Sequence, residues 1–223
     1  MFPTDDSAEA AHEALASLER VLALRAHEIA AVIVEPIQAE GGDRHASPEF
    51  FRGVRSLSEK YGVLMIVDEV QTGGGVTGTL WAHEQWDLET PPDMVTFSKR
   101  LQLAGFFARE DLRAPQPYRN FNTWLGSPIA LLQANTIVDT INKDKLLQNV
   151  QHVAPKLMRG VKEAAEASNG QITNVRNRGF FGAFDLPSPE QRDYVLQQLA
   201  TRRVACGACG DRSVRYTIDT HPN

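Results

Sequence analysis

The strongest constraint on the fold is a pair of short apolar runs that each end in chemically reactive side chains. The first run, residues 63–67, leads into Asp68 and Glu69, then a glutamine and three successive glycines, in VLMIVDEVQTGGGVTG. The second run, residues 94–97, leads into a serine and Lys99. Parallel strands end at the same edge of their sheet, and in α/β folds ligands bind beyond these carboxyl ends. The sequence therefore predicts a ligand site that contains an acid and a lysine.

The segments around these runs predict a parallel βαβ unit. Ser7 is placed to cap a helix over residues 7–29, and Ser47 and Pro48 are typical of a helix start. The order of elements predicted for the first part is a helix over 7–29, a strand over 30–34, a helix from 48 to 61 and strands over 63–67, 94–97 and 104–108. A strand, helix and strand in succession indicate parallel pairing with a right-handed crossover.

The pattern changes after Ser127. A long helical region follows, with an interruption near residues 142–143 and a possible bend at Pro155. Paired strands over 172–175 and 180–184, a helix over 187–201 and a strand–turn–strand over 204–217 complete the second part. We therefore predict an α/β first part over 1–125, a helical connector over 126–145 and a smaller α+β domain over 146–223.

Composition excludes several classes of function. The net charge of -5 argues against non-specific nucleic-acid binding, which needs a basic surface. No apolar run approaches the ~20 residues that span a bilayer, so we expect no membrane contact. The acidic start is unlike a targeting peptide. Cys206 and Cys209 form a single C-x-x-C pair, so we expect neither a disulfide framework nor a metal site.

The two strand ends leave several kinds of chemistry open. Asp68 is either a structural cap, a ligand for Mg²⁺ as in a Walker B strand, or the partner of a protonated ring nitrogen. Most lysines are solvated, but Lys99 directly follows an apolar strand, so we expect its stem to begin in the interior. Burial lowers the pKa of a lysine and exposes a nucleophilic amine that can form a Schiff base with an aldehyde. Together the two residues describe a pyridoxal phosphate site.

Other residues near these runs have structural explanations. A nucleotide-hydrolysing domain is disfavoured because the sequence has no G-x-x-x-x-G-K-[ST] loop. The three glycines from Gly73 either form a tight turn or let the backbone approach a ligand. We expect His83 to be packed and hydrogen-bonded, and Glu35 to be a structural or supporting acid. A structural interpretation of Thr123 is that it caps a helix.

Several motifs resemble those of the class III pyridoxal-phosphate aminotransferases, and within them the 4-aminobutyrate type. They are EPIQAEGGDRHASPEFF, IVDEVQTGGGVTG, WAHE, MVTFSK, FNTWLGSP and ACGDRSVR, which together run from about residue 29 to residue 216. The resemblance implies a partial fold-type I transferase, with a mostly parallel sheet in the large domain followed by a partial small domain.

The resemblance also implies roles for individual residues. Lys99 would be the catalytic Schiff-base lysine, and Asp68 the partner of the pyridine nitrogen of pyridoxal 5'-phosphate. Gln71 would contact the phenolic oxygen of the ring. Thr123 would donate to the cofactor phosphate of the neighbouring subunit, which implies a homodimer with shared active sites.

The resemblance further implies that Glu40 and Arg215 determine which substrate binds. Glu40 and Arg215 would form a buried ion pair that opens or closes with the substrate bound, and breaking a buried pair typically costs ~3–5 kcal/mol. This switch would let one site convert an ω-amino acid, 4-aminobutyrate, to succinate semialdehyde and then 2-oxoglutarate to glutamate. An ornithine or acetylornithine aminotransferase, or a non-catalytic partner chain, is the alternative.

The chain departs from the family pattern at both ends. We expect it to lack the Ser/Gly-rich loop that cradles the cofactor phosphate, the aromatic residue that stacks on the ring, and the arginine that binds the substrate carboxylate. We also expect a small domain without its last helix. The chain by itself should then have little or no transaminase activity. The resemblance implies a mitochondrial matrix or cytoplasmic location.

Overall fold

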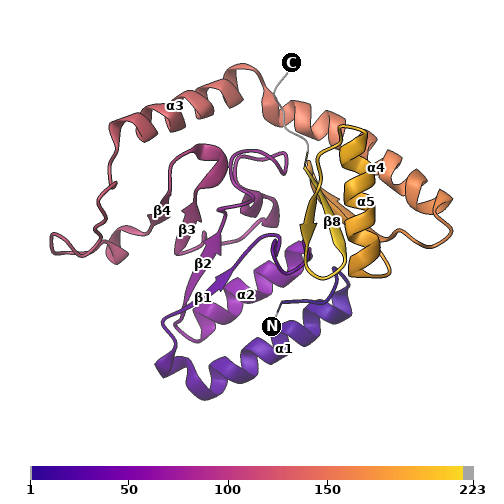
Figure 1. Ribbon diagram of the computed structural model, residues 1–223. Coiled ribbons are helices and arrows are strands. Elements are labelled where there is room, and N and C mark those ends of the chain that lie inside the picture. Colours follow the sequence, from indigo (N-terminus) through magenta and orange to yellow (C-terminus); the bar gives the residue numbers. More distant parts are fainter. Residues whose placement is uncertain (1, 218–223) are drawn as a thin grey trace.

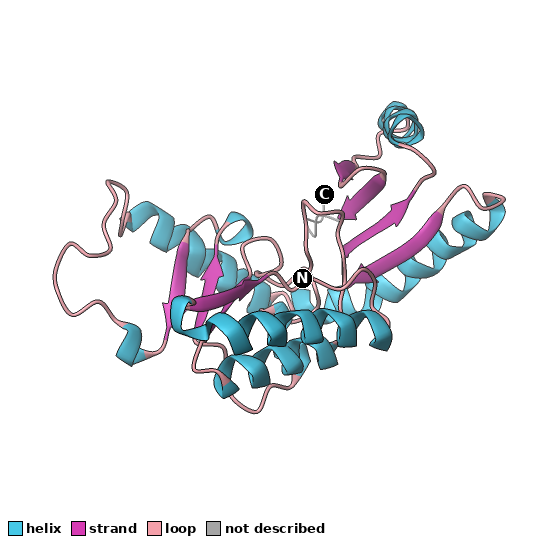
Figure 2. Ribbon diagram, turned by 90° about the horizontal axis from the view of Figure 1, so that it is seen from below, coloured by secondary structure: helices cyan, strands magenta, loops and turns pink. Residues whose placement is uncertain are grey.

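The computed structural model describes residues 2–217 and contains two four-stranded sheets. Figure 1 shows the first sheet with helices α1 and α2 beside it, and the second sheet with α4 and α5. Figure 2 shows the strands in two separate groups. The predicted α/β class of the first part and α+β class of the second are confirmed. The exact domain boundaries stay a prediction.

The first sheet carries the two apolar runs on adjacent strands. Its strands are β1 (Ala31–Val34), β2 (Leu64–Asp68), β3 (Met94–Phe97) and β4 (Gly105–Ala108), in the order β1-β2-β3-β4. The first three are parallel, as predicted, and β4 pairs antiparallel with β3. The carboxyl ends of β2 and β3 therefore meet at one edge of the sheet.

Two helices cover one face of this sheet. They are α1 (Ala8–Arg25) and α2 (Pro48–Lys60), and the hydroxyls of Ser7 and Ser47 accept the N-terminal amide bonds that the sequence predicted. The predicted first helix ends early, and its last turn is the 3-10 helix η1 (Ala26–Glu28). The core between the helices and the sheet includes Phe51 stacked on Trp86, with ring centroids 3.8 Å apart.

The second sheet is antiparallel throughout. Its strands are β5 (Thr173–Arg178), β6 (Phe181–Asp185), β7 (Gly207–Cys209) and β8 (Ser213–Thr217), in the order β5-β6-β8-β7. One face packs on α4 (Leu146–Ala167) and α5 (Pro189–Thr201). Residues of the first part, including Ile37 and Val76, pack with Phe181 in a second cluster. All residues of β6 are buried, because both faces of this strand are covered.

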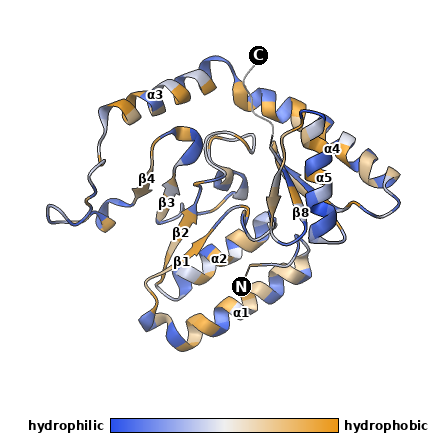
Figure 3. Ribbon diagram, viewed as in Figure 1, coloured by the Kyte–Doolittle hydropathy of each residue, from blue (hydrophilic) through white to orange (hydrophobic). Residues whose placement is uncertain are grey.

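A long helix joins the two parts. Helix α3 (Pro128–Lys143) contacts both α4 and the 3-10 helix η3 (Lys99–Leu101). The predicted interruption falls at Lys145, whose left-handed φ of 54° separates α3 from α4. Pro155 lies inside α4, which continues through it. Figure 3 shows apolar residues along β1 and β2 and also on α3.

Short 3-10 helices complete the described chain. The segment predicted to be irregular contains η2 (Ala82–Trp86), and η4 (Glu110–Leu112) follows β4. Between residues 2 and 217, no helix combines the length and the apolar character that crossing a bilayer requires.

A buried carboxylate ties three strands of the first sheet together. The side chain of Asp93 is 2% exposed and accepts hydrogen bonds from the Met65 amide at 2.7 Å, Arg55 at 2.7 Å and Arg109 at 2.6 Å. Burial alone would raise the pKa of Asp93, but these donors outweigh it and lower the pKa below the usual value. Because Asp93 directly precedes β3, its carboxylate links β3 to β2, to α2 and to the end of β4.

We expect Asp93→Ala to lower the free energy of unfolding by ~3–5 kcal/mol, because Arg55 loses its buried counter-charge and keeps only the half-exposed Glu59 at 3.2 Å. Urea titration of the full chain measures this change. Asp111→Ala is the matched control, since Asp111 also pairs with Arg109 but is 65% exposed. We expect ~0.5 kcal/mol or less for the control. Equal losses in the two variants would contradict the assignment.

Candidate active site

The predicted site residues lie around the carboxyl ends of the first three strands. Asp68 is the last residue of β2 and is paired in register with Thr96 of β3. Lys99 follows β3 and opens η3. Glu40 and Gln71 lie on the loops that follow β1 and β2. The sheet therefore brings these side chains to one edge because its strands are parallel.

Asp68 is held in place through one of its two oxygens. Its Oδ1 accepts hydrogen bonds from the Val70 amide at 3.0 Å and from Thr96 Oγ1 at 3.1 Å. No group within residues 2–217 donates to Oδ2. The half-buried side chain also lines a cavity of about 340 Å³ together with Glu35 and Gln38. The carboxylate is thus oriented and keeps one oxygen that can accept a ligand N–H.

The expectation that the stem of Lys99 is buried is wrong. Strand β3 ends at Phe97, and the chain then turns outward through Ser98, so Lys99 is exposed. Lys99 has a left-handed φ of 46°, a conformation that a non-glycine residue adopts at a cost of ~1–3 kcal/mol and that is concentrated at functional sites. The amine is therefore presented to solvent at the sheet edge.

Glu40 connects the residues that the sequence predicted for this site. Its Oε1 accepts hydrogen bonds from Gln71 Nε2 at 3.0 Å and from Arg215 Nη1 at 3.3 Å. The hydrogen bonds from Gln71 and Arg215, together with the charges of Arg215 and Lys99, lower the pKa of Glu40 despite some desolvation. Four predicted residues from both parts of the chain therefore form one cluster.

The predicted burial of the Glu40–Arg215 pair is wrong. The Glu40 side chain is 76% exposed. The buried partner of Arg215 is Asp43, which is 0% exposed and accepts from Arg215 Nε at 2.8 Å and Nη2 at 2.7 Å. The charge and hydrogen bonds of Asp43 raise the pKa of Arg215 although burial alone would lower it.

Sequence reasoning missed Asp43, although it lies in a quoted motif. The signal that could have found it is the glycine pair before it, in EGGD, because Gly42 has a φ of 114° and Asp43 a φ of 48°. Aspartate tolerates the left-handed region better than most residues. In this turn the short side chain of Asp43 faces Arg215 of the second sheet.

The glycine-rich loop after β2 is a tight turn. Gly74 and Gly75 have φ values of 87° and 98°, which favour glycine. A Cβ on Gly73 would lie 2.7 Å from the Trp81 ring, so this position must stay small. The tight-turn interpretation of the glycines is therefore sufficient to explain them.

Two acids beside the strand ends are structural. Glu69 is 0% exposed and accepts from both the amide and Nδ1 of His83, the ring contact being 2.9 Å. The prediction that His83 is packed and hydrogen-bonded is confirmed. Glu35 accepts from the Ala39 amide at 3.1 Å, and burial raises its pKa against that bond. Both acids support loops of the candidate site.

Thr123 lies outside this cluster. It belongs to the exposed segment between η4 and α3, which extends away from the first sheet in Figure 1. Several large apolar side chains in and after this segment are exposed, among them Tyr118 at 85%, Trp124 at 82% and Ile129 at 72%. The structure therefore places Thr123 on an apolar surface rather than beside Lys99.

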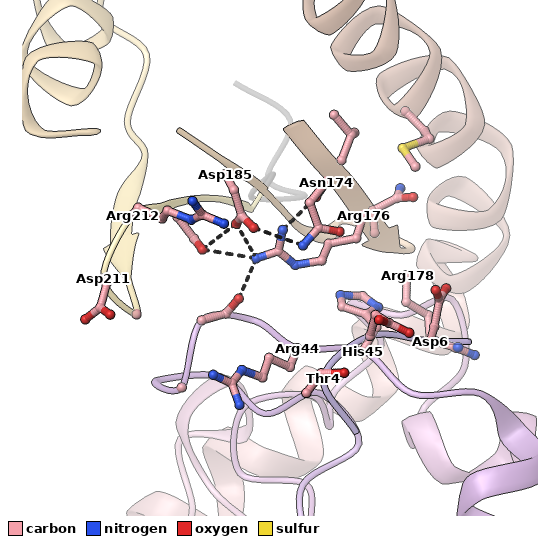
Figure 4. Close-up of a pocket in the computed structure, with 18 of the residues that line it drawn as sticks. Thr4, Asp6, Arg44, His45, Asn174, Arg176, Arg178, Asp185, Asp211 and Arg212 are labelled. Atoms are coloured by element: carbon pink, nitrogen blue, oxygen red, sulfur yellow. Dashed lines mark hydrogen bonds and ion pairs between the residues drawn. The ribbon is translucent and has the colours of Figure 1, made fainter. Parts of the chain in front are cut away.

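A polar cleft of about 540 Å³ lies between the two parts and is lined by Gly42 and Arg44 of the first part and by Arg176 of the second. Arg176 of β5 crosses it and donates to the carbonyl of Gly42 at 2.6 Å (Figure 4). His45 lines the cleft, and its Nε2 is the buried side-chain nitrogen that has no partner among the described residues. Burial, with the charges of Arg178 and Arg176, lowers the pKa of His45 to about 3.

Comparison with known proteins identifies the family. Residues 2–219 match the family described as aminotransferase class III. The chain belongs to the class III aminotransferases. A 4-aminobutyrate aminotransferase of Dictyostelium discoideum is 49% identical over 84% of this chain and 38% of the relative. The mitochondrial 4-aminobutyrate aminotransferase of Sus scrofa is 45% identical over the same shares, 84% and 38%.

A solved structure of this aminotransferase family has the same fold. The lysine aminotransferase of Mycobacterium tuberculosis superimposes with a TM-score of 0.89 at 35% identity, covering 99% of this chain and 53% of that one. The chain therefore spans less than half the length of the curated relatives and about half of that structure.

Members of this family use pyridoxal phosphate, and the residues present fit its ring. An exposed amine at Lys99, an oriented carboxylate with a free oxygen at Asp68 and the Gln71 amide side chain lie at one sheet edge. This donor set matches an aldehyde, a ring N–H and a phenolic oxygen. These three residues would hold the ring.

We expect the free energy of unfolding to fall as the pH drops from about 6.5 to about 3. Over this range His45 is protonated in the unfolded chain but stays neutral in the folded chain, because folding lowers its pKa to about 3. One such group contributes at most ~1.4 kcal/mol per pH unit. His45→Phe should remove this contribution, as urea titrations at several pH values can show. His152→Phe, at an exposed histidine, is the control. Parallel curves for the wild type and His45→Phe would contradict the assignment.

Proposed function

We propose that this chain carries the lysine-bearing part of an aminotransferase site that moves an amino group from an ω-amino acid, 4-aminobutyrate, to 2-oxoglutarate. The observation that carries the proposal is the contact of Glu40 with both Gln71 and Arg215 beside Lys99. This contact supports a site in which the proposed cofactor residue Gln71 and the proposed substrate residue Arg215 lie together. The names of the two curated relatives support this donor.

Each residue of the chain has a defined task in this proposal. Pyridoxal phosphate, when bound, supplies an electron-accepting ring. Asp68 would hold the ring nitrogen and favour its protonated form. Gln71 would orient the ring at its phenolic oxygen. The Lys99 amine would hold the cofactor at its aldehyde and would move a proton to and from the substrate carbon.

Arg215 and Glu40 select between the two substrates. The donor has one carboxylate, and 2-oxoglutarate has two. With Glu40 on Nη1, this edge of Arg215 is occupied and does not attract a second carboxylate, which suits the amine end of an ω-amino acid. When a second substrate carboxylate arrives, Arg215 exchanges Glu40 for it. The exchange is easy because Glu40 is exposed, and exposed pairs are worth only ~0–1 kcal/mol.

A second aminotransferase function is favoured by the solved structure. The superimposed enzyme is a lysine aminotransferase at 35% identity, so another diamine or ω-amino acid, such as ornithine or acetylornithine, is the alternative donor. A non-catalytic partner chain of an aminotransferase is a further alternative. Glutamate formation from each candidate donor distinguishes these proposals.

The exposed apolar segment supports a homodimer. We propose that a second copy covers the surface around Trp124 and Leu132, which are 82% and 68% exposed. Thr123 on this surface would then reach the cofactor phosphate of the neighbouring subunit. The curated relative from Sus scrofa is named as mitochondrial, so we propose the mitochondrial matrix as the location, with the cytoplasm as the alternative.

We expect pyridoxal phosphate followed by borohydride to label Lys99 in preference to other exposed lysines, because Lys99 lies at the sheet edge where Asp68 offers an acceptor for the ring nitrogen. Peptide mass analysis of the labelled chain measures the site. Asp68→Ala should reduce the labelling of Lys99 severalfold.

Lys60→Ala is the control, since Lys60 is 58% exposed but lies on α2, away from the strand ends. It should leave the labelling of Lys99 unchanged. Labelling spread evenly over exposed lysines would refute the proposed cofactor site.

We expect the full chain to sediment as a dimer and Trp124→Glu to shift it toward the monomer by at least tenfold in dissociation constant, because a charge would be buried at the interface. Sedimentation velocity over a range of concentrations measures this shift. Tyr194→Glu is the control, at a 61% exposed aromatic residue on α5. A monomeric wild type would overturn the proposed dimer.

A further inference from the structure

The guanidinium group of Arg215 is contacted on two different edges. Its Nε donates to Asp43 Oδ1 at 2.9 Å and Oδ2 at 2.8 Å, and its Nη2 donates to Oδ1 at 2.7 Å. The remaining contact, from Nη1 to Glu40, is longer at 3.3 Å and involves one oxygen. Arginine has five N–H donors in a fixed fork. The Asp43 contacts use one edge and leave the N–H groups of the other edge available.

The two carboxylates differ sharply in their surroundings. Asp43 is 0% exposed, whereas Glu40 is 76% exposed. A bidentate, buried arginine–carboxylate contact is strong and geometrically specific. An exposed contact through one oxygen is weak and screened by salt. The edge that faces Glu40 can therefore change partners while the edge that faces Asp43 stays bound.

The backbone that carries Asp43 is itself fixed. The amide of Asp43 donates to the carbonyl of Ala39 at 3.0 Å, and residues 38 and 44 exchange two backbone hydrogen bonds at 2.9 and 3.1 Å. Arg176 Nε donates to the carbonyl of Asp43 at 2.9 Å from the second sheet. This turn is therefore a rigid support rather than a mobile loop.

Two neighbours complete the surroundings of the pair. The thiol of Cys209 donates to Asp43 Oδ2 at 3.4 Å, and the Phe181 ring centroid lies 5.4 Å from Arg215 Cζ. Burial and the Asp43 carboxylate raise the pKa of Cys209 to about 12, so the thiol stays a hydrogen-bond donor. Both carboxylate oxygens of Asp43 thus accept hydrogen bonds from Arg215 or Cys209 without any contact to substrate.

We propose that Asp43 is the positioning residue of the substrate switch: it holds the Nε and Nη2 edge of Arg215 permanently, so that only the Nη1 edge exchanges between Glu40 and a substrate carboxylate. The inference rests on the proposed function, because it assumes that Arg215 meets a substrate carboxylate. A substrate carboxylate then finds the guanidinium already oriented, and the switch consists of the movement of Glu40 alone. Asp43 does not touch substrate.

The side-chain ¹⁵N signals of arginine in the full chain test the proposal directly. The Nε–H signal of Arg215 is assigned by its loss in Arg215→Lys. We expect slow hydrogen exchange at this Nε–H in the wild type and, within twofold, in Glu40→Gln. Asp43→Asn should exchange at least tenfold faster. Rapid exchange in Glu40→Gln, or unchanged exchange in Asp43→Asn, would overturn the proposal.

Glutarate serves as the dicarboxylate probe of the other edge. We expect it to bind Glu40→Gln at least threefold more tightly than the wild type, and Asp43→Asn at least tenfold more weakly. Absence of binding to the wild type and to Glu40→Gln would refute the assumption about the substrate carboxylate. The exchange rates would still decide whether Asp43 holds Arg215, so the two failures are distinguishable.

A measurement on the wild type covers the case in which Asp43→Asn does not fold. Side-chain carboxyl ¹³C signals of Glu40 and Asp43 are followed with and without glutarate. We expect the Glu40 signal to shift while the Asp43 signal and the Arg215 Nε signal stay fixed. A shift of the Asp43 signal, or glutarate binding without a shift at Glu40, would contradict the division of roles.

Discussion

The contact between Arg215 and Asp43 is the interaction on which the candidate site depends. The two residues are 172 positions apart, with Asp43 on the loop after β1 and Arg215 on β8, and their contacts of 2.7–2.9 Å are largely buried. A charge buried in this way requires its partner, so neither sheet can move away without a large loss of stability. The pair therefore determines where the second sheet presents its arginine to the strand ends of the first.

The turn that carries Asp43 collects further contacts between the two parts. Arg176 donates to the carbonyls of Gly42 and Asp43, and the amide of Gly210 donates to the carbonyl of Glu40 at 3.2 Å. Backbone carbonyls and a buried acid on one side thus face cations and amides on the other. This polar complementarity adds to the apolar contacts that Ile37 and Val76 make with Phe181 across the junction.

Most of the fold was predictable from local patterns. The strand over residues 94–97 and the helix from Pro48 were predicted correctly because an apolar run and a serine–proline cap depend on neighbours in the sequence. The position of Asp68 at a strand end followed in the same way. The burial of Lys99 and of the Glu40 pair was predicted wrongly. Exposure depends on how the chain turns after a strand and on what packs there, which apolar periodicity does not report.

The sequence by itself determined the elements of this protein, their parallel pairing in the first part and the family motifs that mark Asp68, Gln71 and Lys99. Each of these rests on local spacing and on side-chain chemistry. Only the tertiary structure decided which acid holds Arg215. Glu40 and Asp43 are three residues apart in one motif, and both are carboxylates. Their difference comes from a left-handed turn that points Asp43 toward the second sheet and leaves Glu40 in solvent.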